Sequence, residues 1–332
     1  MTRLFMTGVE AGSLRAFTSY VGSPSVSSAV KRTGAYSLYI DRYDRSVTIV
    51  LNTGPSEIYI RCGIYATVYA RDSAPAIYFC DASGTVQVAI GFSIAGTLQL
   101  FHSYDTVIAT GSPIVFNTWY CLEARLKIDN SAGVAQVKMD GVLEIDYAGD
   151  TQKSSNASIG IVQLGGQKAA YRYFYGYFDD IAINDTNGTE NNSWIGRGGI
   201  YPAIVDGAGE YAEFTPASGN NWENVDEIPP DDDTSYVESD TLGHRDLYTI
   251  DSITPTSGTI TAVQWVARAK MVEPGIGNLQ RLVRHDSVDY AGADKPVDTS
   301  YRYLTDIMEL APDDTAWTVA KVNALQIGQK VN

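Results

Sequence analysis

Residues 134–145 read Val134-Ala135-Gln136-Val137-Lys138-Met139-Asp140-Gly141-Val142-Leu143-Glu144-Ile145. Two strand-like runs flank the dipeptide Asp140-Gly141, which is typical of a two-residue type I′ turn. The stretch therefore predicts a β-hairpin. Residues 77–90 repeat the pattern, with a slightly longer turn at residues 81–84.

Strand-forming residues continue along most of the chain. Residues 58–69 are rich in β-branched and aromatic side chains, and Gly, Asn, Asp and Ser interrupt such runs at the spacing of short strands. Long amphipathic helices are not expected. One short helix is predicted over residues 315–322, with Asp313 or Asp314 as its cap. Many short strands with local turns indicate an all-β antiparallel sandwich or barrel.

Composition excludes several classes of protein. The formal net charge is −15, with −3 up to Glu190 and −12 from Asn191 onward. Such acidity argues against nucleic acid as a partner. The apolar runs fall far short of the roughly 20 residues that span a membrane, and residues 1–10 show no secretory signal. Membrane partners are therefore not expected. The three cysteines are expected to be buried free thiols.

A polar stretch, residues 184–193, separates two strand-rich parts of the chain. It cannot join a hydrophobic core, so we expect a domain boundary there. The predicted domains are residues 1–188 and residues 189–332, the second being smaller and carrying acidic loops.

Four patches of the first domain occur in an order similar to that of concanavalin A-like, laminin G-like jelly rolls. Residues 5–10 look like the opening strand, followed by residues 33–38. Residues 117–125 look like the central strand, and residues 178–181 like the closing strand. The resemblance covers a little over half of the chain. It implies an N-terminal jelly-roll sandwich whose closing strand lies beside its opening strand, followed by a second, smaller β-sandwich.

The whole arrangement also resembles structural proteins of tailed bacteriophages. Residues 219–227 and residues 317–328 add to this likeness in the second half. The resemblance implies a virion protein that is assembled in the bacterial cytoplasm and contacts other virion proteins. It also implies self-association into homo-oligomers, trimers in particular, because virion appendages occupy symmetric sites.

Glu10, Asp179 and Asp180 form the acidic group that most suggests a metal site, with Glu10 and Asp180 as the expected ligands. In sandwiches of this kind, acidic residues of the first and last strands often share a structural calcium ion, which takes about 6–8 oxygen ligands. Strand alternation implies that Asp179 points away if Asp180 points toward the first strand. The alternative is a set of ordinary solvated carboxylates at a strand edge.

Five aromatic residues fall within residues 171–177. Alternation places Tyr171, Tyr173, Tyr175 and Tyr177 on one face of a strand. Such a ladder of tyrosines predicts a protein contact or a glycan-binding surface, or else part of the sandwich interior.

The sequence shows no catalytic pattern. The Glu-x-Asp-x-x-Glu arrangement of concanavalin-like glucanases starts at Glu144 but has Gly149 in place of the second Glu. The sequence also contains no nucleophile elbow and no phosphate-binding glycine loop. We therefore expect a structural protein that is not an enzyme. The alternative function is a carbohydrate-binding module that recognises host surface glycans.

Overall fold

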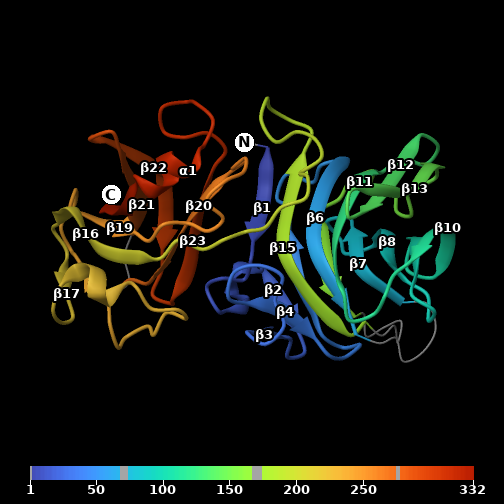
Figure 1. Ribbon diagram of the computed structural model, residues 1–332, viewed down its shortest axis with the longest axis horizontal. Helices are drawn as coiled ribbons and strands as arrows, with labels where there is room; N and C mark the ends of the chain where they lie inside the picture. Colours follow the sequence, from blue (N-terminus) through green and yellow to red (C-terminus); the bar gives the residue numbers. More distant parts are fainter. Residues whose placement is uncertain (1, 68–73, 167–173, 274–276) are drawn as a thin grey trace. The chain divides into compact units, whose positions relative to one another are not determined.

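The computed structural model describes residues 2–67, 74–166, 174–273 and 277–332. Nearly all of its regular structure is antiparallel β-sheet, which confirms the predicted all-β fold class. The chain divides into two compact units, residues 1–200 and residues 201–332 (Figure 1).

Two large sheets build the first unit. The first sheet has eight strands in the order β13-β12-β11-β6-β15-β4-β3, and β1 also pairs with β15. Its strands are β1 (Arg3–Thr7), β3 (Ser25–Ser27), β4 (Ser37–Ile40), β6 (Glu57–Ala66), β11 (Trp119–Lys127), β12 (Gly133–Met139), β13 (Val142–Gly149) and β15 (Gly176–Asp185).

The second sheet has seven strands in the order β10-β9-β8-β7-β14-β5-β2. Its strands are β2 (Ser19–Val21), β5 (Ser46–Val50), β7 (Ala74–Cys80), β8 (Val86–Phe92), β9 (Thr97–His102), β10 (Thr106–Pro113) and β14 (Ile161–Gly165). Alternate residues of both sheets, such as Ile64, Phe178 and Phe79, meet in one buried cluster. The first unit is therefore a jelly-roll sandwich, as the resemblance implied.

Local sequence signals agree with the observed hairpins. Asp140 and Gly141 have φ angles of 51° and 85°, as a type I′ turn requires, and they join β12 to β13. The closing strand β15 pairs with the opening strand β1, with Thr7 opposite Ile181. The expected return of the last strand to the first is confirmed.

The boundary between the units lies after Ile200, rather than after Gly188 as the sequence suggested. Residues 194–200 make specific contacts with the rest of the first unit. The N–H of Gly196 donates to Glu123, the N–H of Ile200 donates to Asp180, and the ring of Trp194 meets that of Tyr59 edge-on. These contacts hold the segment to the sandwich.

A smaller β-sandwich forms the second unit. Its main sheet has the order β16-β19-β24-β21-β22, and β20 pairs with β23 on the other side of a small core around Trp317 and Val283. The elements are β16 (Val205–Ala212), β17 (Thr215–Pro216), β18 (Val237–Glu238), β19 (Arg245–Ile250), β20 (Val263–Ala269), β21 (Gly277–His285), β22 (Val288–Val297), β23 (Arg302–Met308), α1 (Val319–Asn323) and β24 (Gln326–Val331).

The single α-helix of the described residues, α1, is shorter than predicted and begins later. Thr318 caps it by accepting from the N–H of Lys321. Asp313 instead accepts from the Lys321 ammonium, 2.6 Å away, so it anchors the helix from the side. In the part of the chain that the structure covers, we find no helix with the length and apolar character needed to cross a membrane.

Candidate functional site

Four aromatic side chains form a row across the first sheet. Tyr177 of β15 lies opposite Tyr39 of β4 and Tyr65 of β6, and Tyr65 lies opposite Trp119 of β11. Directly paired residues of neighbouring strands share a face, so the four rings line up perpendicular to the strands. We call Tyr39, Tyr177, Tyr65 and Trp119 the aromatic row.

The aromatic row lies on the face opposite the core. The strand neighbours Leu38, Ile64 and Phe178 belong to the buried cluster between the sheets, and side chains alternate between faces along a strand. Each ring of the row is half-buried. The row is therefore a surface feature, not part of the sandwich interior.

Ring geometry distinguishes the members of the row. Tyr39 and Tyr177 are stacked, with ring centroids 4.5 Å apart and planes inclined by 19°. Tyr65 meets Tyr177 edge to face at 81°, and it is tilted by 56° against Trp119. In this stacked pair, each ring covers one face of the other. The rings of Tyr65 and Trp119 are the better placed to receive a ligand.

The polar atoms of the row have no protein partners among the described residues. Neither the hydroxyls of Tyr39, Tyr65 and Tyr177 nor the indole N–H of Trp119 take part in any hydrogen bond of that part of the chain. Tyr and Trp rings combine an apolar face with a polar handle, which suits a ligand that has both apolar and hydroxylated surfaces.

The tyrosine ladder predicted from the sequence contributes only partly to the row. Tyr177 is a member, whereas Tyr175 precedes β15 and its carbonyl accepts from the N–H of Thr67, 3.0 Å away. Tyr171 and Tyr173 lie outside the described residues. Sequence reasoning missed Tyr39, Tyr65 and Trp119 because strand register, which no local pattern specifies, brings them beside Tyr177.

We call Glu10, Asp179 and Asp180 the acidic cluster. Asp179 and Asp180 follow Tyr177 along β15, and Glu10 lies in the turn after β1. Both aspartates are fully buried. The expected alternation fails because β15 has a bulge here and Asp180 has a φ of 53°. Both carboxylates therefore turn to one loop, in which the N–H of Arg32 donates to Asp179 (2.8 Å) and its guanidinium donates to Asp180 (2.6 Å).

Burial and the charge of Asp180 raise the pKa values of Glu10 and Asp179. Burial, with a smaller contribution from the charge of Asp180, raises the pKa of Glu10 to about 7. Burial and the neighbouring charge of Asp180 also raise the pKa of Asp179 to about 8. A cation beside the cluster would relieve both effects, because a positive charge favours the ionised form.

The predicted calcium site at Glu10 and Asp180 has only some of the free carboxylate oxygens that a calcium ion requires. Oε1 of Glu10 is buried and has no hydrogen-bond partner, while Oε2 accepts from the N–H of Ala35. The carboxylate of Asp180 already accepts from Arg32, Thr33 and Ile200. Within the described ranges, three His, Cys, Asp or Glu side chains do not gather around one point. Calcium therefore stays a prediction, tested below.

The comparisons with known proteins find similar solved structures at low sequence identity. No family model matches the chain, and no curated protein matches it. The cellulose-induced protein Cip1 is 16% identical, over 53% of this chain and 88% of that one, with a TM-score of 0.41. The endo-β-1,4-glucuronan lyase of Trichoderma reesei is 14% identical, over 56% and 96%, with a TM-score of 0.44. Domain 4 of the Geobacillus stearothermophilus arabinanase AbnA is 10% identical, over 55% and 92%, with a TM-score of 0.40.

These matches correct one expectation. The sequence analysis predicted a protein that is not an enzyme, and this prediction is contradicted. The solved structures similar to the chain include the glucuronan lyase, the alginate lyase Aly36B and a Trypanosoma rangeli sialidase. Because several of these proteins are enzymes, we do not propose that this chain lacks catalytic activity. At such identities the likeness shows the fold alone, and it assigns no reaction to this chain.

Proposed function

We propose that the first unit binds carbohydrate through the aromatic row. The observation that carries the proposal is a surface row of four half-buried rings whose hydroxyls and indole N–H lack partners in the described residues. A sugar ring offers C–H groups that pack on an aromatic face and hydroxyls that bond to polar atoms at its edge. The row supplies both kinds of contact.

The row is long enough for more than one sugar. Its four strands are neighbours, and adjacent strands lie roughly 4.8 Å apart, so the row extends over about 14 Å. The Tyr39–Tyr177 stack stiffens one end, and Tyr65 with Trp119 offers ring surface at the other. We therefore expect oligosaccharides to bind more tightly than monosaccharides.

The test is affinity electrophoresis or a glycan array with the whole chain and two variants. Trp119→Ala removes a ring from the row. Tyr104→Ala removes an exposed tyrosine elsewhere, 38% of which is accessible, and serves as the control. We expect Trp119→Ala to weaken binding about tenfold, a typical effect of losing one well-placed aromatic contact. The control should bind like the parent chain.

The proposal is overturned if the parent chain binds no polysaccharide of a broad panel. It is also overturned if both variants bind as well as the parent chain does. Comparing the unfolding midpoints of both variants separates a lost contact from a lost fold.

We further propose that the chain belongs to the particle of a tailed bacteriophage, where it would contact other virion proteins and recognise host surface glycans. The sequence patches at residues 219–227 and 317–328 support this proposal through their resemblance to such proteins. Light scattering after size exclusion tests the expected trimer, whose mass would be three times 36.0 kDa. A monomer at all concentrations would contradict self-association.

A further inference from the structure

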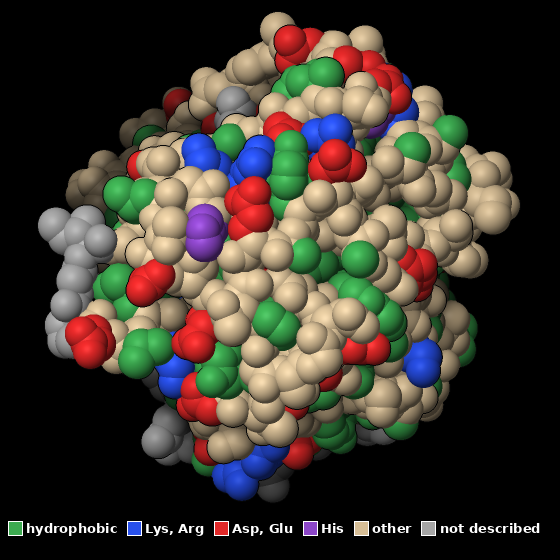
Figure 2. All heavy atoms as spheres, turned by 90° about the vertical axis from the view of Figure 1, so that its left-hand side faces the viewer, with side chains coloured by type: hydrophobic (Ala, Val, Ile, Leu, Met, Phe, Trp, Pro, Cys, Tyr) green, Lys and Arg blue, Asp and Glu red, His purple; other side chains and the backbone are tan. Residues whose placement is uncertain are grey.

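The second unit has one basic side chain without an acidic partner among its described residues. Its charge is 9 − 22 = −13, and Figure 2 shows acidic side chains scattered over one face of the molecule with basic ones beside them. Eight of its nine Lys and Arg residues form ion pairs: Arg245, Arg268, Lys270, Arg281, Arg284, Lys295, Arg302 and Lys321. Lys330 is the ninth.

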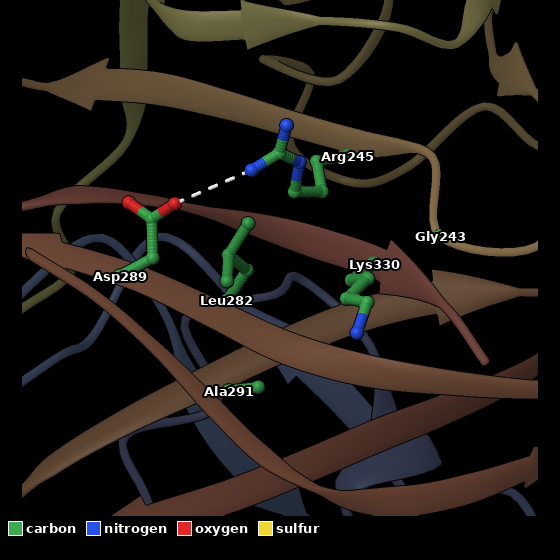
Figure 3. A pocket seen from close by; sticks show the side chains of 6 residues that line it. All are labelled: Gly243, Arg245, Leu282, Asp289, Ala291 and Lys330. Carbon is green, nitrogen blue, oxygen red and sulfur yellow. Dashed lines mark hydrogen bonds and ion pairs between the residues drawn. The ribbon is translucent and has the colours of Figure 1, made fainter.

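Lys330 borders a hollow of about 340 Å³ on the main sheet of this unit. The hollow is lined by Gly243, Arg245, Leu282, Asp289, Ala291 and Lys330, and Figure 3 shows Leu282 amid the three charged side chains. Its size lies at the lower end of the range of small-molecule sites, roughly 300–1,000 Å³.

Strand register explains the hollow. Leu282 of β21 lies opposite Gly328 of β24 and Ala291 of β22, so one row across the sheet carries short or apolar side chains. The next row holds longer ones, because Lys330 lies opposite both Arg245 and Gln280. The row of Leu282, Gly328 and Ala291 thus forms an apolar surface, and the row that contains Lys330 and Arg245 borders it with polar side chains.

One side of the hollow offers a positive charge that no acidic side chain of the described residues neutralises. Asp289 is neutralised by ion pairs with Arg245 (3.5 Å) and Arg284, so it does not compensate Lys330. The ammonium of Lys330 therefore borders the hollow without an acidic partner among the described residues.

We propose that this hollow binds a sugar that carries a carboxylate, a uronic acid. Its carboxylate pairs with the ammonium of Lys330, and its C–H face packs on Leu282 and Ala291, which line the hollow. A neutral sugar lacks the ionic contact, and a small carboxylate such as acetate lacks the ring contact. This site is separate from the aromatic row, and the inference goes beyond the function proposed for that row.

The experiment measures binding of sodium glucuronate, glucose and acetate to the whole chain by calorimetry or NMR titration at low salt. Lys330→Gln removes the ammonium. Ala291→Leu fills the hollow without changing charge, at an exposed position. The matched control is Lys321→Gln, because Lys321 is already paired with Asp313. Unfolding midpoints show whether each variant is folded.

We expect glucuronate to bind in the millimolar range, and glucose and acetate to bind at least about fivefold more weakly. Lys330→Gln and Ala291→Leu should each weaken glucuronate binding at least about fivefold, as expected when a charged hydrogen bond or the space for the ring is lost. Lys321→Gln should leave it unchanged. The Trp119→Ala variant should also bind glucuronate normally, which separates this site from the aromatic row.

Three results would overturn the inference. Glucuronate does not bind, acetate binds as tightly as glucuronate, or folded Lys330→Gln and Ala291→Leu bind it as the parent chain does.

Discussion

The two units bury their side chains in different ways. The first unit is nearly neutral, with 15 basic and 17 acidic residues, and its two large sheets enclose one extended core. The second unit has 9 basic and 22 acidic residues and a core of a few residues around Trp317. Those of its ion pairs that have an exposed partner, such as Lys270–Asp233 and Arg302–Asp298, add little stability, because surface pairs contribute only about 0–1 kcal/mol each. We infer that the second unit depends on its small core and unfolds first.

Removing the side chain of Trp317 is the strongest test of whether the second unit depends on its small core. Its side chain is 3% exposed and its indole N–H donates to the carbonyl of Met308, 3.0 Å away. Trp317→Ala should cost about 3–5 kcal/mol, which is a large part of the stability of a small domain. Calorimetry should show the low-temperature transition lost or shifted strongly downward, while the other transition stays in place.

Val266→Ala is the control, because Val266 lies in the same unit and is 45% exposed. This substitution should change the unfolding midpoint only slightly. If Trp317→Ala moved both transitions together, the two units would not unfold independently, and the comparison would fail.

Calcium is expected to act on the first unit alone. Binding to the acidic cluster at about a hundred times the Kd would add about 2.7 kcal/mol to the free energy of unfolding. Adding a chelator should therefore lower the midpoint of the first unit and leave that of the second unchanged. Glu10→Gln removes the one buried carboxylate oxygen of the cluster that lacks a partner, so it should abolish the calcium effect.

The pH dependence sharpens the same test. The pKa of Glu10 is raised from its usual 4.5 to about 7, so the folded state holds this proton more tightly than the unfolded state does. With calcium removed by a chelator, the contribution of Glu10 to the free energy of unfolding is fully present below pH 4.5. It is lost as the pH rises through about 7. Glu10→Gln should remove this part of the slope. An unchanged midpoint with and without calcium at all pH values would contradict the calcium prediction.

Asp81 provides an opposite pH response in the first unit. Burial alone would raise its pKa, but hydrogen bonds from Ser83, Ser154, Thr85 and Asn156 outweigh burial and hold the pKa well below 3.8. Its stabilising contribution is therefore present above pH 3.8 and is lost as the pH falls below it.

Asp81→Asn keeps the shape of this side chain and removes its charge. It should lower the stability of the first unit by about 2 kcal/mol at neutral pH, in the range expected for hydrogen bonds to a charged group. The difference from the parent chain should shrink in acid, as urea titrations at several pH values would show. A constant difference down to pH 2 would count against this role of the charge.

Local patterns predicted the local parts of this structure. The hairpin at Asp140-Gly141, the strands that flank it and the short helix near Trp317 follow from turn chemistry and side-chain type. The candidate sites could not be predicted in this way. Tyr65 and Trp119 meet because strands far apart in sequence pair in one register, and a bulge turns Asp180 toward the same loop as Asp179. Register and bulges depend on the whole sheet.

The smallest effect we expect concerns the turn itself. Gly141 has a φ of 85° and only ordinary contacts around the position of a Cβ, so backbone strain, not crowding, limits substitution there. Gly141→Ala should cost about 1–2 kcal/mol, the usual penalty for a left-handed L-residue. Gly141→Asn should cost clearly less, because Asn tolerates this conformation. The midpoint of the first unit in urea measures both. If Gly141→Ala and Gly141→Asn lowered the free energy of unfolding equally, backbone strain would not explain the loss. The result would instead mean that any side chain at this position clashes with its surroundings, and that the turn does not set the register of β12 and β13 through its backbone.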